Sequence, residues 1–282
     1  MDKIGVIGAG TMGSGVAQYL AHSGYEVVMH DVKTKFLESA MDNIESFLDK
    51  SIEKGKLTGE EKEEILNFIT PSTDMKKMKD RDLIIEAATE DMEIKKKIFH
   101  DVDTICPPET ILATNTSALS ITELATTTDR PEKVLGIHFF NPVPLMELVE
   151  CVKGLTTDEQ IYEKCCEFIE ETGKEVVRVK ESPGFIVNRL LIPMINEAAF
   201  LLQNNVAAAE DIDTAMKKGA NHPIGPLALG DMIGLDVCLS IMETLHKDIG
   251  EDKYRPCHLI RRKVRAGHLG RKTGQGFYDY SQ

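Results

Sequence analysis

The chain has 282 residues and a formal net charge of −13, from 33 Lys and Arg against 46 Asp and Glu. This acidity argues against nucleic acid as a partner, and an anionic ligand would need a local basic patch. No stretch is long and apolar enough to span a membrane, and the chain begins directly with a predicted strand, so we expect neither a membrane segment nor a signal or transit peptide.

The six cysteines form no C-x-x-C pair and show no zinc-type spacing. Scattered cysteines of this kind are typical of reduced, mostly buried thiols in a cytosolic protein. We therefore expect a cytoplasmic location and no metal site.

Residues 3–31 predict a strand, a tight glycine turn, a helix, a second strand and a terminal acid. The glycines fit G-x-G-x-x-G, and each has a physical reason to be there. Gly8 lets the chain turn sharply, Gly10 has no Cβ to keep a pyrophosphate away, and Gly13 lets the helix pack close to the strand.

The residues after this turn complete a dinucleotide-binding pattern. Thr11 and Met12 open the helix, whose first N–H groups and positive dipole end favour phosphates. Asp31 follows Gly13 by about 18 residues, close to the spacing of the acid that binds the ribose hydroxyls. An aspartate there repels a 2′-phosphate, so we predict NAD rather than NADP; His30 is expected to be a solvated strand-end residue. The alternative is a βαβ unit without a ligand.

A long helix is predicted over residues 33–54, with an apolar stripe formed by Phe36, Ala40, Ile44, Phe47, Leu48 and Ile52. Its other face carries Lys50 and Lys54, which by themselves are typical of a solvated basic face. A second helix is expected to follow, with Thr58 as its N-cap and its end near Asn67.

The segment 82–87 predicts a fully buried strand, and polar residues follow it. The carboxyl ends of parallel strands are where doubly wound folds bind ligands. Glu90 and Lys95, which come just after this strand, are therefore candidates for the edge of a cofactor site.

The next predicted strand, 110–113, runs into a hydroxyl-rich segment, 114–117. Any one of these hydroxyls can serve as a turn or helix cap. Ser120, which stands three residues before Glu123, is the better cap candidate. That assignment leaves Ser117 for a ligand.

Two further apolar strands, 134–140 and 146–152, each contain one polar outlier, His138 and Glu150. The stiff turn 141–144 joins them, so the two outliers are predicted to meet. A carboxylate raises the basicity of an imidazole and fixes its tautomer, as a general base requires. A hydrogen-bonded core histidine is the alternative that the residues leave open.

The alternation of strands and helices continues through a helix at 159–172 and a strand at 175–179, and it stops near residue 184. Beyond that point only helical patterns follow, at 185–203, 208–218, 227–247 and 256–266. We predict a Rossmann-type α/β domain over residues 1–184 and an all-α domain over 185–282. The apolar faces of the helical domain exceed what one small bundle needs, which predicts a homodimer through this domain.

Several segments resemble the 3-hydroxyacyl-CoA dehydrogenase family, and the resemblance extends over essentially the whole chain. They are GAGTMG, EAATED, ATNTS, HFFNPVPLMELVE, SPGFIVNRL, the stretch DIDTAM…GPLALGDMIGLD, and RKTGQGFYDY. The short, free-standing form that acts on the four-carbon thioester is the most similar. The resemblance implies NAD-dependent interconversion of 3-hydroxybutyryl-CoA and acetoacetyl-CoA, in butyrate or fatty-acid metabolism.

The resemblance also implies roles for particular residues. The family's catalytic histidine falls on His138 and its carboxylate partner on Glu150. Its serine, near the substrate oxygen and the nicotinamide, falls on Ser117. Its two asparagines fall on Asn141 and on Asn188, the latter from the helical domain.

Ligand contacts follow from the same resemblance. The implied NAD contacts are Gly8, Gly10, Thr11, Met12, Gly13, Asp31, Glu90, Lys95, Ser117, Asn141 and, from the tail, Lys272. The implied contacts to the CoA thioester are Ser117, Asn188, Lys50 and Lys54. The basic face of the helix 33–54 then becomes the patch that an acidic chain needs for the CoA phosphates.

Two other interpretations compete with this one. A dehydrogenase of the β-hydroxyacid or polyol-phosphate type would carry a lysine base in the interdomain helix, where this chain has Asn188 and Arg189. A non-catalytic relative that only senses NAD would not need Ser117, His138 and Glu150 together.

Overall fold

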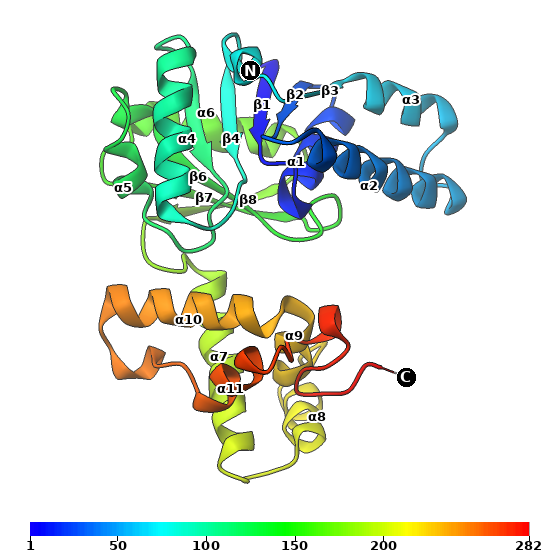
Figure 1. Cartoon of the computed structure of the whole chain (residues 1–282), viewed down its shortest axis with the longest axis vertical. Helices are drawn as coiled ribbons and strands as arrows, with labels where there is room; N and C mark the ends of the chain where they lie inside the picture. The colour runs from blue at the N-terminus through cyan, green and yellow to red at the C-terminus, as the bar shows by residue number, and fades with distance from the viewer. Residues whose placement is uncertain (282) are drawn as a thin grey trace. The chain divides into compact units, whose positions relative to one another are not determined.

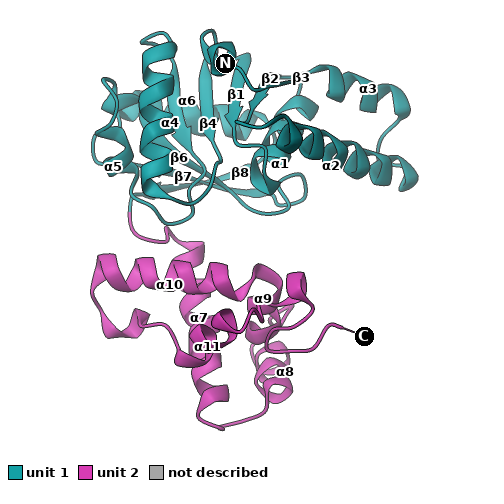
Figure 2. Ribbon diagram, viewed as in Figure 1, with its two compact units in different colours: residues 1–181 teal, residues 182–282 magenta. Residues whose placement is uncertain are grey.

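The computed structural model describes residues 1–281, and the chain divides into two units (Figure 2). Unit 1 is Met1–Glu181 and unit 2 begins at Ser182. This division lies close to the boundary predicted after residue 184. No helix among residues 1–281 is long and apolar enough to cross a membrane.

Unit 1 is built on one eight-stranded sheet with the order β3-β2-β1-β4-β5-β6-β7-β8 (Figure 1). The strands are β1 (Lys3–Ile7), β2 (Glu26–His30), β3 (Ile69–Ser72), β4 (Leu83–Glu86), β5 (Ile111–Thr114), β6 (Val134–Phe139), β7 (Leu148–Lys153) and β8 (Glu175–Lys180). The strands β1 to β6 run parallel to one another, while β7 is antiparallel to β6 and parallel to β8. The carboxyl ends of β1, β4, β5 and β6 therefore meet at one edge, here called the carboxyl edge, where β7 begins.

Helices connect these strands, which confirms the predicted Rossmann-type α/β fold. They are α1 (Thr11–His22), α2 (Thr34–Glu53), α3 (Gly59–Asn67), α4 (Met92–Ile105), α5 (Ile121–Ala125) and α6 (Glu159–Glu171), with 3₁₀ turns η1 (Met75–Met78) and η2 (Pro131–Lys133). Thr58 caps α3 as predicted, in a capping box with Glu61.

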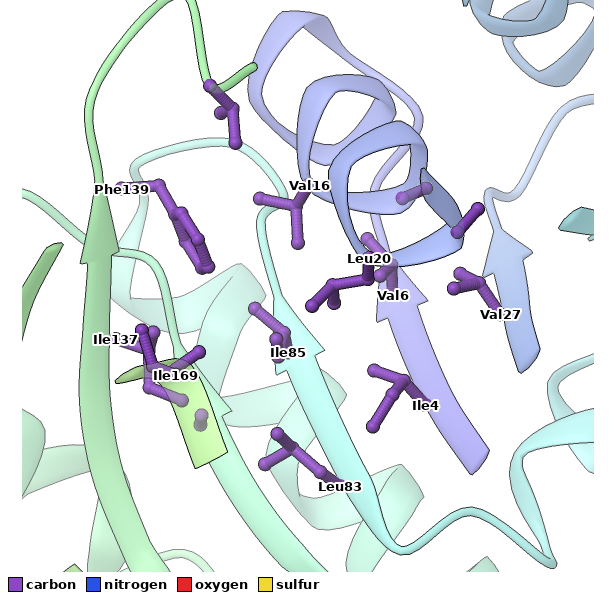
Figure 3. Close-up of a cluster of buried hydrophobic side chains, with 14 of the residues drawn as sticks. Ile4, Val6, Val16, Leu20, Val27, Leu83, Ile85, Ile137, Phe139 and Ile169 are labelled. Carbon is purple, nitrogen blue, oxygen red and sulfur yellow. The ribbon is translucent and has the colours of Figure 1, made fainter. Parts of the chain in front are cut away.

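The main core of unit 1 fixes α1 against the sheet. Figure 3 shows Val16 and Leu20 of α1 beside Ile85 and Phe139 of the strands, and all four are buried. Burial of such side chains contributes roughly 1.5–3 kcal/mol each. This packing holds the first turn of α1 at the carboxyl edge.

The short edge strand β3 was not predicted, because its sequence, ITPS, is brief and contains Pro71. Its presence corrects the expectation that His30 is solvated. His30 is 4% exposed, and its Nδ1 lies 3.0 Å from the carbonyl oxygen of Ser72 in β3.

The predicted apolar stripe of α2 is wrong at one position. Phe36 is 46% exposed, and its neighbour Leu37 is buried instead. Ala40, Ile44 and Leu48 are buried as predicted.

Unit 2 is helical, as predicted. Its helices are α7 (Val187–Gln203), α8 (Ala209–Gly219), α9 (Pro226–Ile233), α10 (Leu235–Ile249) and α11 (His258–Arg265), with 3₁₀ turns η3 (Asp252–Tyr254) and η4 (Arg271–Thr273). The single helix predicted over 227–247 is in fact two. The chain breaks at Gly234, whose φ of +105° few residues other than glycine adopt.

Candidate active site

The glycine turn between β1 and α1 has the geometry that its pattern predicts. Gly8 has a φ of +104°. A Cβ added to Gly13 would lie 1.8 Å from the carbonyl oxygen of Gly8, so only glycine permits this helix–strand contact. A Cβ added to Gly10 would meet nothing within 4 Å. The backbone at Gly10 therefore faces open space, as close approach of a ligand requires.

The first turn of α1 and the end of β2 fit a dinucleotide. Gly10 is the N-cap of α1, and no side chain makes a capping hydrogen bond there. The first N–H groups of the helix, which Thr11 and Met12 begin, point in the direction that favours an anion. Asp31 accepts a hydrogen bond from the N–H of Ala9 at 2.8 Å, which ties this acid to the turn.

A cavity of about 260 Å³ lies against this turn. It is lined by α1, by α2 and by the segment after β6, through Thr11, Ser14, Gly15, Gln18, Asn43, Ile44, Phe47, Asn141, Pro142, Val143 and Pro144. Two of the predicted cofactor residues, Thr11 and Asn141, therefore share one cavity.

Two lysines follow the residues of α2 that line this cavity, one in the helix and one at its C-cap. Asn43 and Phe47 line it, and Lys50 and Lys54 follow at helical spacing on the same face of α2. Both lysines are exposed. A ligand that leaves the cavity along α2 would meet two cationic side chains.

A buried ion pair occupies the carboxyl edge beside β4. Lys95 and Glu86 are each 1% exposed, and Nζ of Lys95 lies 2.7 and 2.9 Å from the two carboxylate oxygens of Glu86. Lys95 also lies 3.5 Å from Glu90. The predicted cofactor residue Lys95 is thus held among carboxylates, below the surface.

Glu86 is a residue that the sequence analysis missed. It accepts further hydrogen bonds from Thr114 and from the N–H of Ala88, both at 2.7 Å. The signal was present, because Glu86, like Glu150, is an acid in an otherwise apolar strand.

Ser117 is more constrained than predicted. Ser120 does cap α5, accepting from the N–H of Glu123 at 3.1 Å. Ser117, however, donates its N–H and its hydroxyl to the same oxygen of Glu90, at 2.9 and 3.1 Å. The network from Glu86 through Lys95 and Glu90 therefore orients Ser117.

The two polar outliers of β6 and β7 lie directly opposite each other in the antiparallel ladder. Nδ1 of His138 is 2.7 Å from Oε2 of Glu150, and the residues are 6% and 1% exposed. A carboxylate only accepts, so we assign the ring proton to Nδ1, which makes Nε2 the basic nitrogen. Asn115 joins this pair to β5, because its Oδ1 accepts from the N–H of Phe139 at 2.9 Å.

The remaining predicted residues belong to unit 2. Asn188 lies in the first turn of α7. Lys272 lies in η4 and forms an ion pair with Asp236 at 2.7 Å. The tail after Lys272 is fixed by Asp231, whose carboxylate accepts from the N–H groups of Phe277 and Tyr278 at 2.8 and 2.9 Å.

Comparison with known proteins covers both units. The model of the 3-hydroxyacyl-CoA dehydrogenase NAD binding domain matches residues 3–182, and the model of the 3-hydroxyacyl-CoA dehydrogenase C-terminal domain matches residues 184–280.

Individual proteins match along the full chain. The chain is 50% identical over 280 residues to a 3-hydroxybutyryl-CoA dehydrogenase of Bradyrhizobium diazoefficiens, which covers 99% of this chain and 96% of that protein. A 3-hydroxybutyryl-CoA dehydrogenase of Clostridioides difficile is 50% identical over 280 residues, 99% of this chain and 100% of that protein. The crystal structure of (S)-3-hydroxybutyryl-CoA dehydrogenase from Ralstonia eutropha matches with a TM-score of 0.96 and 47% identity, covering 100% of both chains. With both units matched, the chain belongs to the 3-hydroxyacyl-CoA dehydrogenase family of oxidoreductases.

Proposed function

We propose that this chain catalyses the NAD-dependent interconversion of 3-hydroxybutyryl-CoA and acetoacetyl-CoA. The observation that carries the proposal is the buried His138–Glu150 pair beside the carboxyl edge, in a chain whose relatives are named for this reaction. NAD, when bound, supplies the acceptor for the hydride that leaves C3 of the hydroxyacyl group.

His138 is the proposed acid and base. In the oxidative direction, its Nε2 takes the proton of the C3 hydroxyl as the hydride leaves, and the C3–O bond becomes a carbonyl. The Glu150 carboxylate stabilises the imidazolium that results. In the reductive direction, the protonated ring returns that proton to the oxygen.

The burial of Glu150 favours a catalytic role for His138 over a purely structural one. A core histidine can be satisfied by a backbone carbonyl, whereas a carboxylate at 1% exposure carries a desolvation cost of several kcal/mol. Such a cost is expected where an imidazolium must form transiently.

Ser117 and Asn188 are proposed to hold the substrate oxygen. The hydroxyl of Ser117 donates to Glu90, and a hydroxyl rotor can turn its hydrogen toward a ligand carbonyl without moving its oxygen. For Asn188 the support is the resemblance of the surrounding SPGFIVNRL segment to the family.

The cofactor contacts proposed in unit 1 are the glycine turn, Asp31, Glu90, Ser117 and Asn141. For Lys95 we propose an indirect role through Glu90, because its side chain is 1% exposed and paired. Lys272 is proposed as a contact from the tail.

The CoA portion is proposed to follow α2. Lys50 and Lys54 would neutralise its phosphates, which the overall charge of −13 would otherwise repel. The cavity beside Asn43 and Phe47 supports this path, because it leads along the same helix face.

The test is the initial rate of NADH oxidation with acetoacetyl-CoA, repeated with NADPH and with unesterified acetoacetate. Turnover only with NADH and the CoA ester is the expected result. Equal use of NADPH would contradict the role of Asp31, and equal use of acetoacetate would contradict the lysine path. Bound NADH without any turnover would refute the proposed reaction.

We further propose that unit 2 forms a homodimer. Apolar side chains remain exposed there within the single chain, among them Leu190 at 71%, Val206 at 66% and Met232 at 52%. Sedimentation analysis should give twice the chain mass of 31.3 kDa. A stable monomer at micromolar concentration would contradict this proposal.

We also propose a cytoplasmic location, which the six free, buried thiols support. The substrates there would be short-chain acyl-CoA esters of butyrate or fatty-acid metabolism.

A further inference from the structure

A buried lysine, Lys174, directly precedes β8 and has no part in the reaction proposed above. Lys174 is 7% exposed. Its Nζ donates to the carbonyl oxygens of Val143 and Met146, at 2.7 and 2.6 Å. These carbonyls belong to the segment 141–147, here called the crossover loop, which joins the His138 strand to the Glu150 strand.

The same ammonium also contacts the helix that follows the glycine turn. Nζ of Lys174 lies 3.8 Å from the centre of the Tyr19 ring in α1, a distance at which cation–π attraction is strong. The hydroxyl of Tyr19 donates to the carbonyl of Thr172 at 2.6 Å, which fixes the ring beneath the lysine. The ammonium group of Lys174 therefore contacts both the crossover loop and α1.

The crossover loop also packs against α1. Val143 is 2% exposed, and a Cβ added to Gly15 would lie 3.1 Å from its side chain. Val143 and Asn141 also line the cavity beside the glycine turn. Movement of this loop would thus change the cavity wall and the spacing between β6 and β7.

Burying an ammonium is costly, and burial lowers the pKa of Lys174 from its ordinary value, against the opposing effect of the Glu147 carboxylate. A hydrophobic side chain would avoid this cost, but it would leave two loop carbonyls without the donor that they have. A lysine supplies up to three donors from a single point, which suits a site where three groups converge.

We propose that Lys174 is a positioning residue that fixes the crossover loop on α1 and so keeps His138 opposed to Glu150 and Asn141 beside the glycine turn. This inference rests on the function proposed above, because the geometry that it preserves is that of the proposed acid–base pair. The contacts of Lys174 described above are to the crossover loop and to α1.

The test variant is Lys174→Met, which keeps an unbranched apolar stem and removes all donors. We expect kcat with acetoacetyl-CoA, counted per NADH-binding site, to fall about 100-fold, as misplacement of reacting groups by about 1 Å does. KM for acetoacetyl-CoA should change by less than about threefold, because the contacts to CoA on α2 are untouched. Lys174→Arg, which restores two donors, should recover part of the rate.

Arg130→Met is the matched control. Arg130 is also buried, at 8% exposure, and it also donates to backbone carbonyls, those of Asp103 and Cys106, at 2.7 and 3.0 Å. It precedes β6 at the end remote from the crossover loop. We expect this variant to lose thermal stability without losing kcat per site.

A spectroscopic measurement makes the test independent of turnover. The hydrogen-bonded Nδ1 proton of His138, identified by its absence in His138→Gln, should shift or broaden in the ¹H NMR spectrum of Lys174→Met and remain unchanged in Arg130→Met. If Lys174→Met does not fold, Tyr19→Leu, which removes the ring beneath the ammonium, should show the same changes to a smaller extent.

The outcomes separate the two proposals. An unchanged Nδ1 signal, together with a kcat per site equal to that of Arg130→Met, would overturn the positioning role. A wild-type protein that does not reduce acetoacetyl-CoA would refute the proposed function instead, and the NMR comparison would still decide whether Lys174 holds the pair.

Discussion

Among single residues, Glu150 has the charge on which the proposed reaction depends most. Glu150→Gln keeps the size of the side chain and an oxygen for Nδ1 of His138, but it removes the negative charge beside the imidazolium. We expect the reductive rate at neutral pH to fall about 10- to 100-fold. Because the cation is then less stable, that rate should also begin to fall at a lower pH than in the wild type.

The measurement is the pH–rate profile of acetoacetyl-CoA reduction for Glu150→Gln and for Glu175→Gln. Glu175 is an exposed carboxylate on the neighbouring strand, so its variant should behave like the wild type. Superimposable profiles for Glu150→Gln and the wild type would count against the acid–base pair.

The residues that sequence could predict are those that break a local pattern. His138 and Glu150 interrupt apolar strands, and the structure places them 2.7 Å apart. Glu86 carries the same signal, yet its partnership with Lys95 could not be foreseen, because nothing in the spacing shows which of two nearby carboxylates a lysine will contact. Lys174 breaks no pattern, since a lysine after a helix-ending glycine is ordinary, and only the fold brings it to the crossover loop.

At the scale of elements, the edge strand β3 helps to bury His30 and so affects its protonation. Burial lowers the pKa of His30 from its ordinary value near 6.5, so the folded protein favours the neutral ring. The unfolded chain then binds more protons just below pH 6.5, and stability from this residue is lost as the pH falls below that value.

This linkage predicts a difference between two histidine variants. The free energy of unfolding in urea should fall less between pH 7 and pH 5 in His30→Gln than in the wild type, because the variant lacks the titrating group. His22→Gln should show the wild-type fall, since His22 is exposed. If the free energy of unfolding falls equally in His30→Gln and in the wild type, burial of His30 does not suppress protonation of its ring.

Elements with clear periodicity were predictable, and short or interrupted ones were not. The long strands and α2 follow apolar runs and stripes that tertiary packing reinforces. The edge strand β3 has four residues, one of them proline, and pairs with β2 alone. Gly234 lies inside an apolar helical pattern, and its positive φ divides α9 from α10. A Cβ added there would lie 2.9 Å from Asp236 and 3.1 Å from Lys272, and these neighbours, distant in sequence in the case of Lys272, are known only from the fold.

For the molecule as a whole, burial predicts the reactivity of the thiols. All six cysteines are free and buried. Burial raises the pKa of Cys106 to about 11 and that of Cys238 to about 12, and only the thiolate reacts. We expect a disulfide reagent at pH 8 to modify the native protein slowly. In urea, where the protein is unfolded, the same reagent should react with six thiols per chain.

Cys166 follows the same rule although its thiol is the more acidic. A hydrogen bond from Cys151 lowers the pKa of Cys166, but the bond exists only while α6 is folded and Cys166 is 0% exposed, so we expect Cys166 to react slowly as well. Immediate modification of several thiols in the native state would contradict the packing described for unit 1.

The α/β-to-helical organisation was predictable from the sequence, because the alternation of strands and helices ends abruptly near residue 184. The family was predictable as well, because its segments are spread over the whole chain. The stiff turn 141–144 was predictable, but the cavity was not, because it is lined by α1, α2 and the segment after β6, which are far apart in sequence.

The most direct test of the proposed reaction is the activity of His138→Gln, because the His138 ring accepts or donates the proton in both directions. His100→Gln is the control, since His100 is an exposed histidine on α4. Both variants should fold and bind NADH like the wild type. We predict that His138→Gln reduces acetoacetyl-CoA about 100- to 10,000-fold more slowly than the wild type, while His100→Gln keeps the full rate. A rate for His138→Gln within about tenfold of the wild type would contradict the role of His138 as the acid and base.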